Sequence, residues 1–427
     1  MSIIGKRIVG KAIATWLGPT GDVARRAARS LRGTSKRLDL YFDPADPWSY
    51  LAAQAAQRLV AAYPIELAVH VVTPPASDVD PQPALRAAHA VRDCQQLADY
   101  WDVEFAGKKE ADPGALRDVG TALVRERAAD EQLRCALELS AAMWANDRKQ
   151  LAKLLGTWGT EAHGSVAPIL NATYAQLREA GHYMGAMLRW NGEWYWGIDR
   201  LAYLEQAVAR DLDGAVAGVV KPREPREPKK LSDKPLRCEL WFSFRSPYSY
   251  LAVEQIERVL APFDVPLVLR PVQPMVVRGL PLPRDKKMYI VRDAKREADR
   301  LGIPFGEICD PLGPGVASCI AIAKWAEPRG ALPAFARSAM RGIWAEARDV
   351  SAYVDLRFIV ERAGLPWAEA KDVLDDAEAP KWAQAAAADL AVVGLWGVPS
   401  FRVGDFIAWG QDRLPLLADR LRRHFSA

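Results

Sequence analysis

Apolar runs typical of β-strands and the 3.6-residue periodicity typical of α-helices follow one another along this chain. Their order predicts strands alternating with helices. Apolar runs at 38–42 and 240–244 predict one strand in each half of the chain. Pro47 and Pro247 then stand where a helix would begin, a position at which proline's missing N–H is tolerated, and alanine- and leucine-rich segments follow. Runs rich in β-branched residues at 67–72 and 265–269 predict a second strand in each half.

Helical periodicity then extends over residues 83–180 and 284–393. Two short strands follow in each half, around turns at 191–192 and 404–405, and a last helix begins near Asp199 or Asp412. Strand, helix, strand, helical insert, hairpin and helix is the order of a thioredoxin-like α/β fold that carries a large all-helical insertion. The pattern predicts two such domains in tandem.

Self-comparison supports this division of the chain. Residues 38–52 return as 238–252, including the shared Ser-Tyr-Leu-Ala, and the Val-Arg-Asp at 91–93 returns at 291–293. The Trp-Gly-x-Asp-Arg-Leu at 196–201 returns at 409–414. Blocks repeated in the same order indicate a tandem duplication.

The repeat sets the expected domain boundaries. A basic extension covers residues 1–36, a diverged thioredoxin-like domain covers 37–214, and a second domain with the candidate active site covers 236–427. Residues 215–235 form the linker, in which prolines among charged residues predict an extended, solvated segment. We expect the two copies to form an intrachain pseudo-dimer.

Composition and charge limit the classes of function that this chain can have. A net charge of +4 gives no reason to expect nucleic-acid binding, and no apolar run reaches the length of an integral membrane segment. The basic residues 1–36 leave two alternatives open: a helix that packs on the first domain, or peripheral contact with a membrane surface or an acidic partner. Five widely spaced cysteines without a C-x-x-C exclude the usual zinc and dithiol spacings and favour a reducing compartment, hence a cytoplasmic protein. The histidines show no metal-ligand spacing.

Three segments of the second copy would meet at one end of its sheet. Ser246 precedes Pro247 at a strand-to-helix junction, where its hydroxyl would either cap the helix or hydrogen-bond a ligand's sulfur. Val398-Pro399 precedes a strand and is either an ordinary trans turn or a cis bend that leaves the Val398 backbone free for a peptide-like ligand. Asp412 would either cap the last helix or, together with Arg413, hold the charged ends of an amino acid.

The F-x-S-P-Y-S-Y-L-A start, the G-V-P-S-F block and the W-G-Q-D-R-L ending resemble the 2-hydroxychromene-2-carboxylate isomerase family, which is related to kappa-class glutathione transferases. The resemblance implies glutathione as cofactor, with Ser246 on its sulfur, Val398 beside cis-Pro399 on its cysteinyl unit, and Asp412 and Arg413 on its γ-glutamyl end. It also implies a glutathione-dependent isomerase, or a close glutathione transferase, that acts on an aromatic or conjugated small molecule. The alternative is a non-catalytic binding protein that has kept only the fold.

The sequence also departs from the family's pattern. Ser243 stands where the family usually has an aspartate, and residues 271–283 lack a clear counterpart of its asparagine. In the first copy Asp46 replaces the serine, where a carboxylate would oppose ionisation of a bound thiol. Gly185-Ala186 replaces Val398-Pro399. We therefore expect the first copy to be a supporting pseudo-domain.

Overall fold

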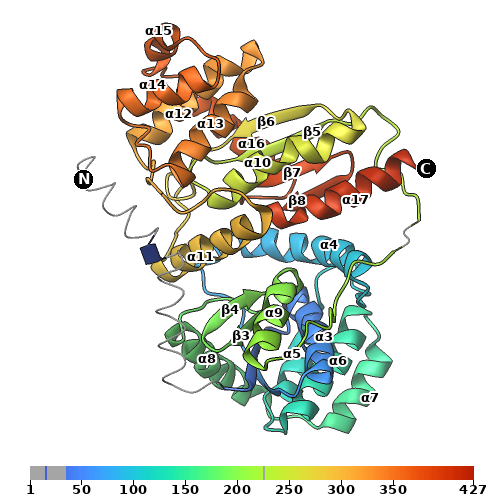
Figure 1. The fold of residues 1–427 in the computed structure, drawn as a ribbon. Helices are drawn as coiled ribbons and strands as arrows, with labels where there is room; N and C mark the ends of the chain where they lie inside the picture. Colours follow the sequence, from blue (N-terminus) through green and yellow to red (C-terminus); the bar gives the residue numbers. More distant parts are fainter. Residues whose placement is uncertain (1–14, 17–34, 225–226) are drawn as a thin grey trace. The chain divides into compact units, whose positions relative to one another are not determined.

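The computed structural model describes residues 15–16, 35–224 and 227–427 (Figure 1). These divide into two compact units. The N-terminal unit contains residues 35–224 and 283–286, and the C-terminal unit contains 15–16, 227–282 and 287–427. The expected basic extension, with its proposed surface contact, lies outside the described residues except for 15–16 and 35–36.

The N-terminal unit is built on a four-stranded sheet of order β2-β1-β3-β4. Its elements in chain order are β1 (Arg37–Phe42), α3 (Pro47–Ala62), β2 (Glu66–Val71), α4 (Pro83–Trp101), α5 (Pro113–Leu123), α6 (Ala129–Trp144), α7 (Arg148–Trp158), α8 (His163–Glu179), β3 (Met187–Trp190), β4 (Glu193–Trp196), the 3-10 turn η1 (Ile198–Arg200) and α9 (Leu201–Asp211). Strand β1 pairs parallel with β2 and antiparallel with β3.

The C-terminal unit has a second four-stranded sheet, of order β6-β5-β7-β8. Its elements are β5 (Cys238–Phe242), α10 (Pro247–Leu260), η2 (Ala261–Phe263), β6 (Leu267–Pro271), α11 (Arg284–Leu301), α12 (Pro314–Ala326), η3 (Glu327–Arg329), α13 (Leu332–Ala345), α14 (Tyr353–Arg362), α15 (Trp367–Ala370), η4 (Lys371–Val373), α16 (Ala379–Val392), β7 (Ser400–Val403), β8 (Phe406–Trp409), η5 (Gln411–Arg413) and α17 (Leu414–Phe425). Strand β5 pairs parallel with β6 and antiparallel with β7. The strand order and pairing therefore match those of the N-terminal unit.

The predicted elements are confirmed in both units. Each apolar run forms a central strand, shifted by up to two residues from its predicted start, and each long helical region forms a set of separate helices. The two closing strands turn at 191–192 and 404–405 as predicted. The predicted fold class, a mixed α/β sheet with a helical insertion, is what the C-terminal unit shows.

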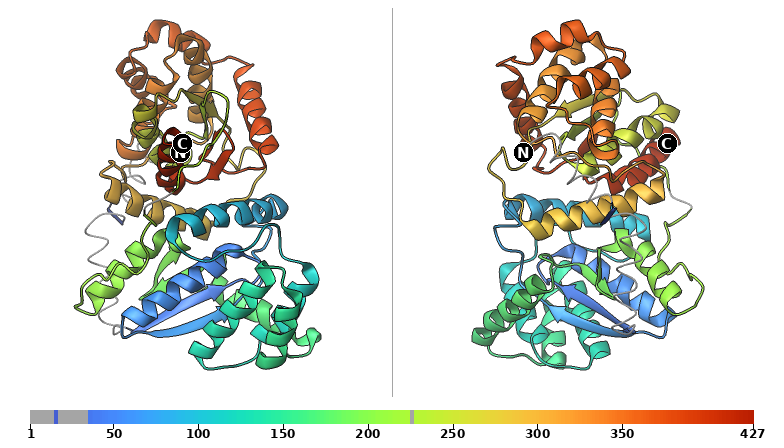
Figure 2. Two further views of the ribbon diagram at one scale, coloured as in Figure 1. Left: turned by 90° about the vertical axis from the view of Figure 1, so that its right-hand side faces the viewer. Right: turned by 60° about the vertical axis from the view of Figure 1, so that its left-hand side comes forward.

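Central strand β5 is buried along its whole length because helices cover both faces of its sheet. Helix α10 packs against α13 and α17, while α16 packs against β5 and β6 through an apolar cluster that includes Trp241, Val272 and Leu390. Helices α12, α13 and α14 gather in one bundle beside the sheet, as Figure 2 shows in its turned views. This packing fixes the start of α10 at the end of β5, where the candidate site lies.

The segment between the units contains no helix or strand among its described residues. Residues 221–224 and 227–230 are exposed, in keeping with the prolines and charges there. On its N-terminal side the Glu205 carboxylate accepts hydrogen bonds from the Tyr63 hydroxyl (2.9 Å) and the Gly218 N–H (2.7 Å). On its C-terminal side the Leu231 N–H donates to Nδ1 of His424 at 3.1 Å. The segment is thus anchored within each unit, and residues 221–224 and 227–230 between the anchors are exposed.

Candidate functional site

Ser246 begins helix α10. Its Oγ accepts a hydrogen bond from the Ser249 N–H at 3.1 Å, so the serine is the N-cap that its position before Pro247 suggests. The same hydroxyl lies 3.4 Å from the Val398 carbonyl oxygen, to which it donates. The side chain is only partly buried. Capping and contact with the Val398 turn therefore occur together, and the residue remains accessible.

The Val398–Pro399 peptide bond is cis, as one of the two sequence alternatives predicted. The Pro399 carbonyl accepts the Gly410 N–H at 2.9 Å, which ties this turn to the segment that contains Asp412. The Trp396 and Trp409 rings pack together with centroids 4.8 Å apart. The structure therefore brings Ser246 and Val398 into contact and connects Pro399 to the start of η5.

Asp412 and Arg413 lie in η5, whose N-cap residue is Gly410. The last helix, α17, has Arg413 as its N-cap residue, and no side-chain cap hydrogen bond is formed at the start of η5 or of α17, so Asp412 is not the predicted helix cap. Arg413 is almost completely buried, with 2% of its side chain exposed, and its guanidinium pairs with Asp412 at 3.3 Å. The Asp412 side chain is 13% exposed and is the more accessible of the two.

Two arginines near this region escaped the sequence analysis. Arg245 directly precedes Ser246, and its guanidinium makes two 2.8 Å hydrogen bonds to the two carboxylate oxygens of Asp310. Arg278, in the loop between β6 and α11, donates to the Trp396 carbonyl just before the Val398 turn. Its loop belongs to residues 271–283, which offered no periodicity to interpret. Arg278 is identified by proximity in the fold alone, whereas Arg245 is adjacent to Ser246 in the sequence as well.

Tyr248, in the first turn of α10, donates its hydroxyl proton to Asp293 of α11 at 2.7 Å. Arg296 also contacts that buried carboxylate, at 3.2 Å. Ser243 is buried, and its Oγ has no hydrogen-bond partner among the described residues. The serine thus leaves a buried polar atom unsatisfied at the end of β5, where the family's pattern has a carboxylate.

The equivalent position of the N-terminal unit is occupied differently. Asp46 caps α3 by accepting the Trp48 N–H, and Arg86 lies 3.8 Å from its carboxylate. Asp43 is completely buried beside it, and its Oδ2 has no hydrogen-bond partner in the described part of the chain. Ala186 stands where the other unit has Pro399, and its N–H, which proline lacks, donates to Ser49 Oγ at 2.7 Å. Protein groups thus fill this position in the N-terminal unit.

Burial dominates the acid–base behaviour of these two carboxyls. Loss of hydration raises the pKa of Asp43 to about 7, and the neighbouring Asp46 charge adds to the effect. Burial likewise raises the pKa of Asp46 to about 6, although Arg86 opposes the shift. Two carboxyls and one guanidinium therefore share a site that favours the protonated acids.

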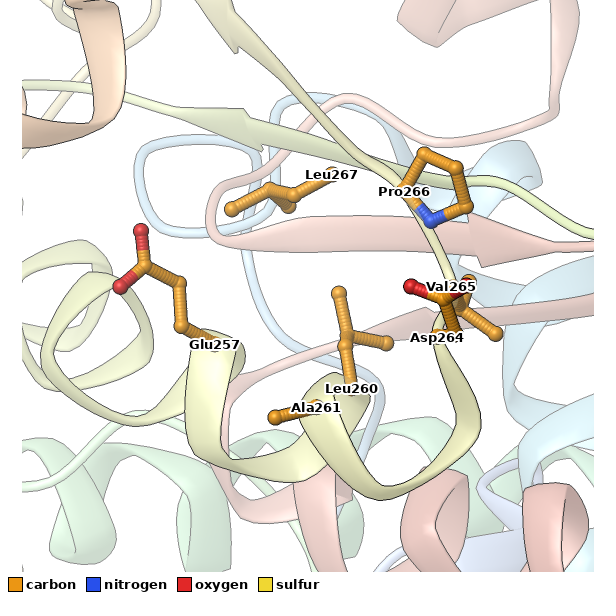
Figure 3. Close-up of a pocket in the computed structure, with 7 residues that line it drawn as sticks. All are labelled: Glu257, Leu260, Ala261, Asp264, Val265, Pro266 and Leu267. Atoms are coloured by element: carbon orange, nitrogen blue, oxygen red, sulfur yellow. The ribbon is translucent and has the colours of Figure 1, made fainter.

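A surface depression of about 370 Å³ lies elsewhere in the C-terminal unit (Figure 3). It is lined by Glu257, Leu260, Ala261, Asp264, Val265, Pro266 and Leu267. These residues surround the C-terminal end of α10, whereas Ser246 stands at its N-terminal end. The depression is therefore separate from the candidate site, at a distance of about one helix length, or roughly 20 Å.

Within the described residues, no group of three or more His, Cys, Asp or Glu side chains is arranged to hold a metal ion. No helix in that same part of the chain has the length and apolar character required to cross a bilayer. All five cysteines are buried and free.

A mixed four-stranded sheet, a helix that starts at its central strand and a cis-proline turn facing that helix start define the class of thioredoxin-like proteins. A family model described as a DSBA-like thioredoxin domain matches residues 237–422. The C-terminal half of the chain therefore has a thioredoxin-like DsbA fold. The match to this family model does not include the N-terminal unit.

Solved structures similar to this chain include isomerases and oxidoreductases. One is a 2-hydroxychromene-2-carboxylate isomerase (21% identity, 44% of this chain and 94% of that chain, TM-score 0.38). Another is a probable DsbA oxidoreductase from Streptomyces coelicolor (21% identity, 45% and 90%, TM-score 0.37). A third is the cytosolic disulfide reductase DsbM from Pseudomonas aeruginosa (17% identity, 44% and 96%, TM-score 0.34). No curated protein sequence matches the chain.

Proposed function

We propose that this protein is a glutathione-dependent isomerase of the 2-hydroxychromene-2-carboxylate type, or a closely related glutathione transferase, acting on an aromatic or conjugated small molecule. The observation that carries the proposal is the Ser246 hydroxyl. It stands at the N-terminus of α10, is partly exposed, and lies 3.4 Å from the Val398 carbonyl oxygen. A hydroxyl donor at the positive end of a helix dipole suits an anionic sulfur.

Each residue of the site has a proposed part. Ser246 Oγ accepts the Ser249 N–H, and its own proton, which is donated to the Val398 carbonyl at 3.4 Å, would turn to a bound ligand's sulfur. The backbone of Val398 would pair with the cysteinyl unit of glutathione, and Asp412 would bind the γ-glutamyl ammonium. The buried Arg413 would orient the Asp412 carboxylate through their ion pair. Bound glutathione supplies a thiolate nucleophile that adds reversibly to the conjugated substrate.

This site has no thiol groups for dithiol exchange, because serines occupy both positions where a cysteine pair would stand. Ser249, the second of them, is fully buried, and its Oγ accepts the Ser243 N–H at 3.3 Å. The five cysteines are buried and free, a state that a reducing compartment maintains. On that ground the proposed location is the cytoplasm.

We also propose that the two units arose by tandem duplication and act as a pseudo-dimer with one working site. Equivalent contacts support this. Trp48 Nε1 donates to Asp93 at 2.8 Å in the N-terminal unit, just as the Tyr248 hydroxyl donates to Asp293 at 2.7 Å in the other. A common origin accounts for the same helix-to-helix hydrogen bond at matching positions of the repeat.

Two substitutions at one position test the function. Ser246→Ala removes both the cap and the sulfur donor, whereas Ser246→Asp keeps a cap and places a negative charge where the thiolate would lie. Both should lower glutathione-dependent isomerisation of a 2-hydroxychromene-2-carboxylate, or conjugation of a chlorinated aromatic acceptor, by about 100-fold or more. Only the alanine variant should lose stability, by about 1 kcal/mol.

The exposed Ser426→Ala serves as the matched control and should behave like the native protein. Unchanged turnover in the two Ser246 variants would remove the serine from the reaction. Glutathione binding by calorimetry without any turnover would favour the alternative of a non-catalytic binding protein. Absence of both binding and turnover would refute the glutathione proposal altogether.

A further inference from the structure

Arg278 is a partly buried cation without a matching anion. Its Nη2 donates to the Trp396 carbonyl, while its Nε is buried with no hydrogen-bond partner among the described residues. Burial lowers the pKa of this guanidinium, and no carboxylate of the described chain offsets the effect. Removing a charged group from water without a counter-ion is costly, so such a group is unusual in a folded protein.

Other arginines of the same unit show how the chain normally neutralises this charge. Arg245 is held by both carboxylate oxygens of Asp310. Arg270 and Arg402 share the buried Glu239. Arg278 differs from these in having only a neutral carbonyl oxygen as its partner, and this leaves part of its planar donor set unused.

The position of Arg278 links it to the candidate site. The Trp396 carbonyl that it contacts lies two residues before Val398, a separation of about 7 Å at most. Gly397 packs directly against the Trp409 ring between them, so the turn has little room to shift. Val276 and Val277, next to Arg278 in the loop, are exposed hydrophobic residues at 39% and 53%. A cation, an apolar surface and a serine donor therefore come from neighbouring segments.

We propose that Arg278 binds a carboxylate of the ligand held at Ser246. A guanidinium fork matches a carboxylate in geometry and charge, and an apolar neighbourhood strengthens the pair. The identity of the ligand rests on the proposed function, but the carboxylate specificity rests on Arg278 alone. Two sources offer this chemistry, namely the glycyl end of glutathione and an acid group on the conjugated substrate.

Two pairs of probes separate the sources. Calorimetry would compare glutathione with its glycyl monoethyl ester, and trans-cinnamate with cinnamamide, on the full-length protein. The native chain should bind the acid of at least one pair about 10- to 100-fold more tightly than its neutral analogue. Arg278→Gln, which keeps a donor for the Trp396 carbonyl but no charge, should abolish that preference. Arg278→Lys should retain part of it.

Arg357→Met, which removes one exposed positive charge on α14, is the control and should keep the native preference. A native protein that prefers neither acid would overturn the inference, as would an Arg278→Gln variant that keeps the preference. Equal weakening of acid and neutral probes would also overturn it, since Arg278 would then only support the loop. If the native protein binds neither glutathione nor its ester, the proposed function fails, and the cinnamate pair alone decides the role of Arg278.

Discussion

At the scale of single residues, the two units differ most where each helix following the central strand begins. Ser246 is a neutral, partly exposed cap, whereas Asp46 is an acid buried beside a second acid, Asp43. Arg86 can neutralise only one of these two, and it also binds Asp80 at 2.6 Å. Burial therefore favours the protonated carboxyls at this position of the N-terminal unit.

The raised pKa values of these two carboxyls make the stability of the N-terminal unit depend on pH. Because the folded-state pKa values of Asp43 and Asp46 are raised above the ordinary 3.8, their contribution is complete below about pH 4 and is lost as the pH rises through about 7. Asp43→Asn should remove much of this slope and raise stability at pH 8 by roughly 2 kcal/mol. Thermal unfolding at pH 5 and pH 8 measures the effect, and an unchanged pH dependence would show that Asp43 is already ionised in the fold.

Some site residues could be predicted because a local sequence pattern marks them, whereas other site residues have no such pattern. Ser246 follows a strand and precedes a proline, and Pro399 precedes another strand, so local patterns mark both. Arg278 has no such mark, because its proposed role rests on a long-range contact with the Trp396 carbonyl and on the lack of a counter-ion among the described residues. The burial of Arg413 was equally hidden, since charge alone suggests an exposed side chain.

At the scale of elements, the strands were predicted best. A buried strand must be apolar along its length, and a closing hairpin needs turn residues, so both leave strong patterns. For the helical insertions, the sequence predicted only where the whole helical region begins and ends, and not the boundaries of the separate helices. Connections such as 346–352 begin and end within charged segments whose ion pairs, including Arg348 with Asp355 at 3.1 Å, depend on the packed fold. Such boundaries are set by tertiary contacts and not by local periodicity.

The turn between α16 and β7 gives a prediction at this scale. A Cβ added at Gly397 would lie 2.5 Å from Nε1 of Trp409, so Gly397→Ala must displace either the ring or the Val398 turn. Glutathione affinity should fall about tenfold or more, with a loss of stability of about 1–3 kcal/mol from overpacking. Gly156→Ala in α7, where an added Cβ meets nothing within 4 Å, is the control. Native affinity in Gly397→Ala would mean that the position of the turn does not matter for binding.

At the scale of the whole molecule, the described chain contains two sheets of the same order. Under the proposed function, the start of α10 at Ser246 binds the anion and the start of α3 at Asp46 does not. A homodimer of identical domains would carry two such sites. In this chain Asp46 and Ala186 fill the second position with a carboxylate and a hydrogen-bonded N–H. These groups are the basis of our proposal that the C-terminal unit binds the ligand and the N-terminal unit supports it.

This asymmetry predicts the stoichiometry of binding. Calorimetric titration of the full-length chain with glutathione should give one molecule per chain, and Ser246→Asp should eliminate it, since a carboxylate there opposes the thiolate. Asp46→Ser should not create a second site, because Asp43 stays buried nearby and Ala186 still closes on Ser49. Two molecules per native chain, or one that survives Ser246→Asp, would assign a ligand to the N-terminal unit. The functional division would then rest on different substrates for the two units instead of on the loss of one site.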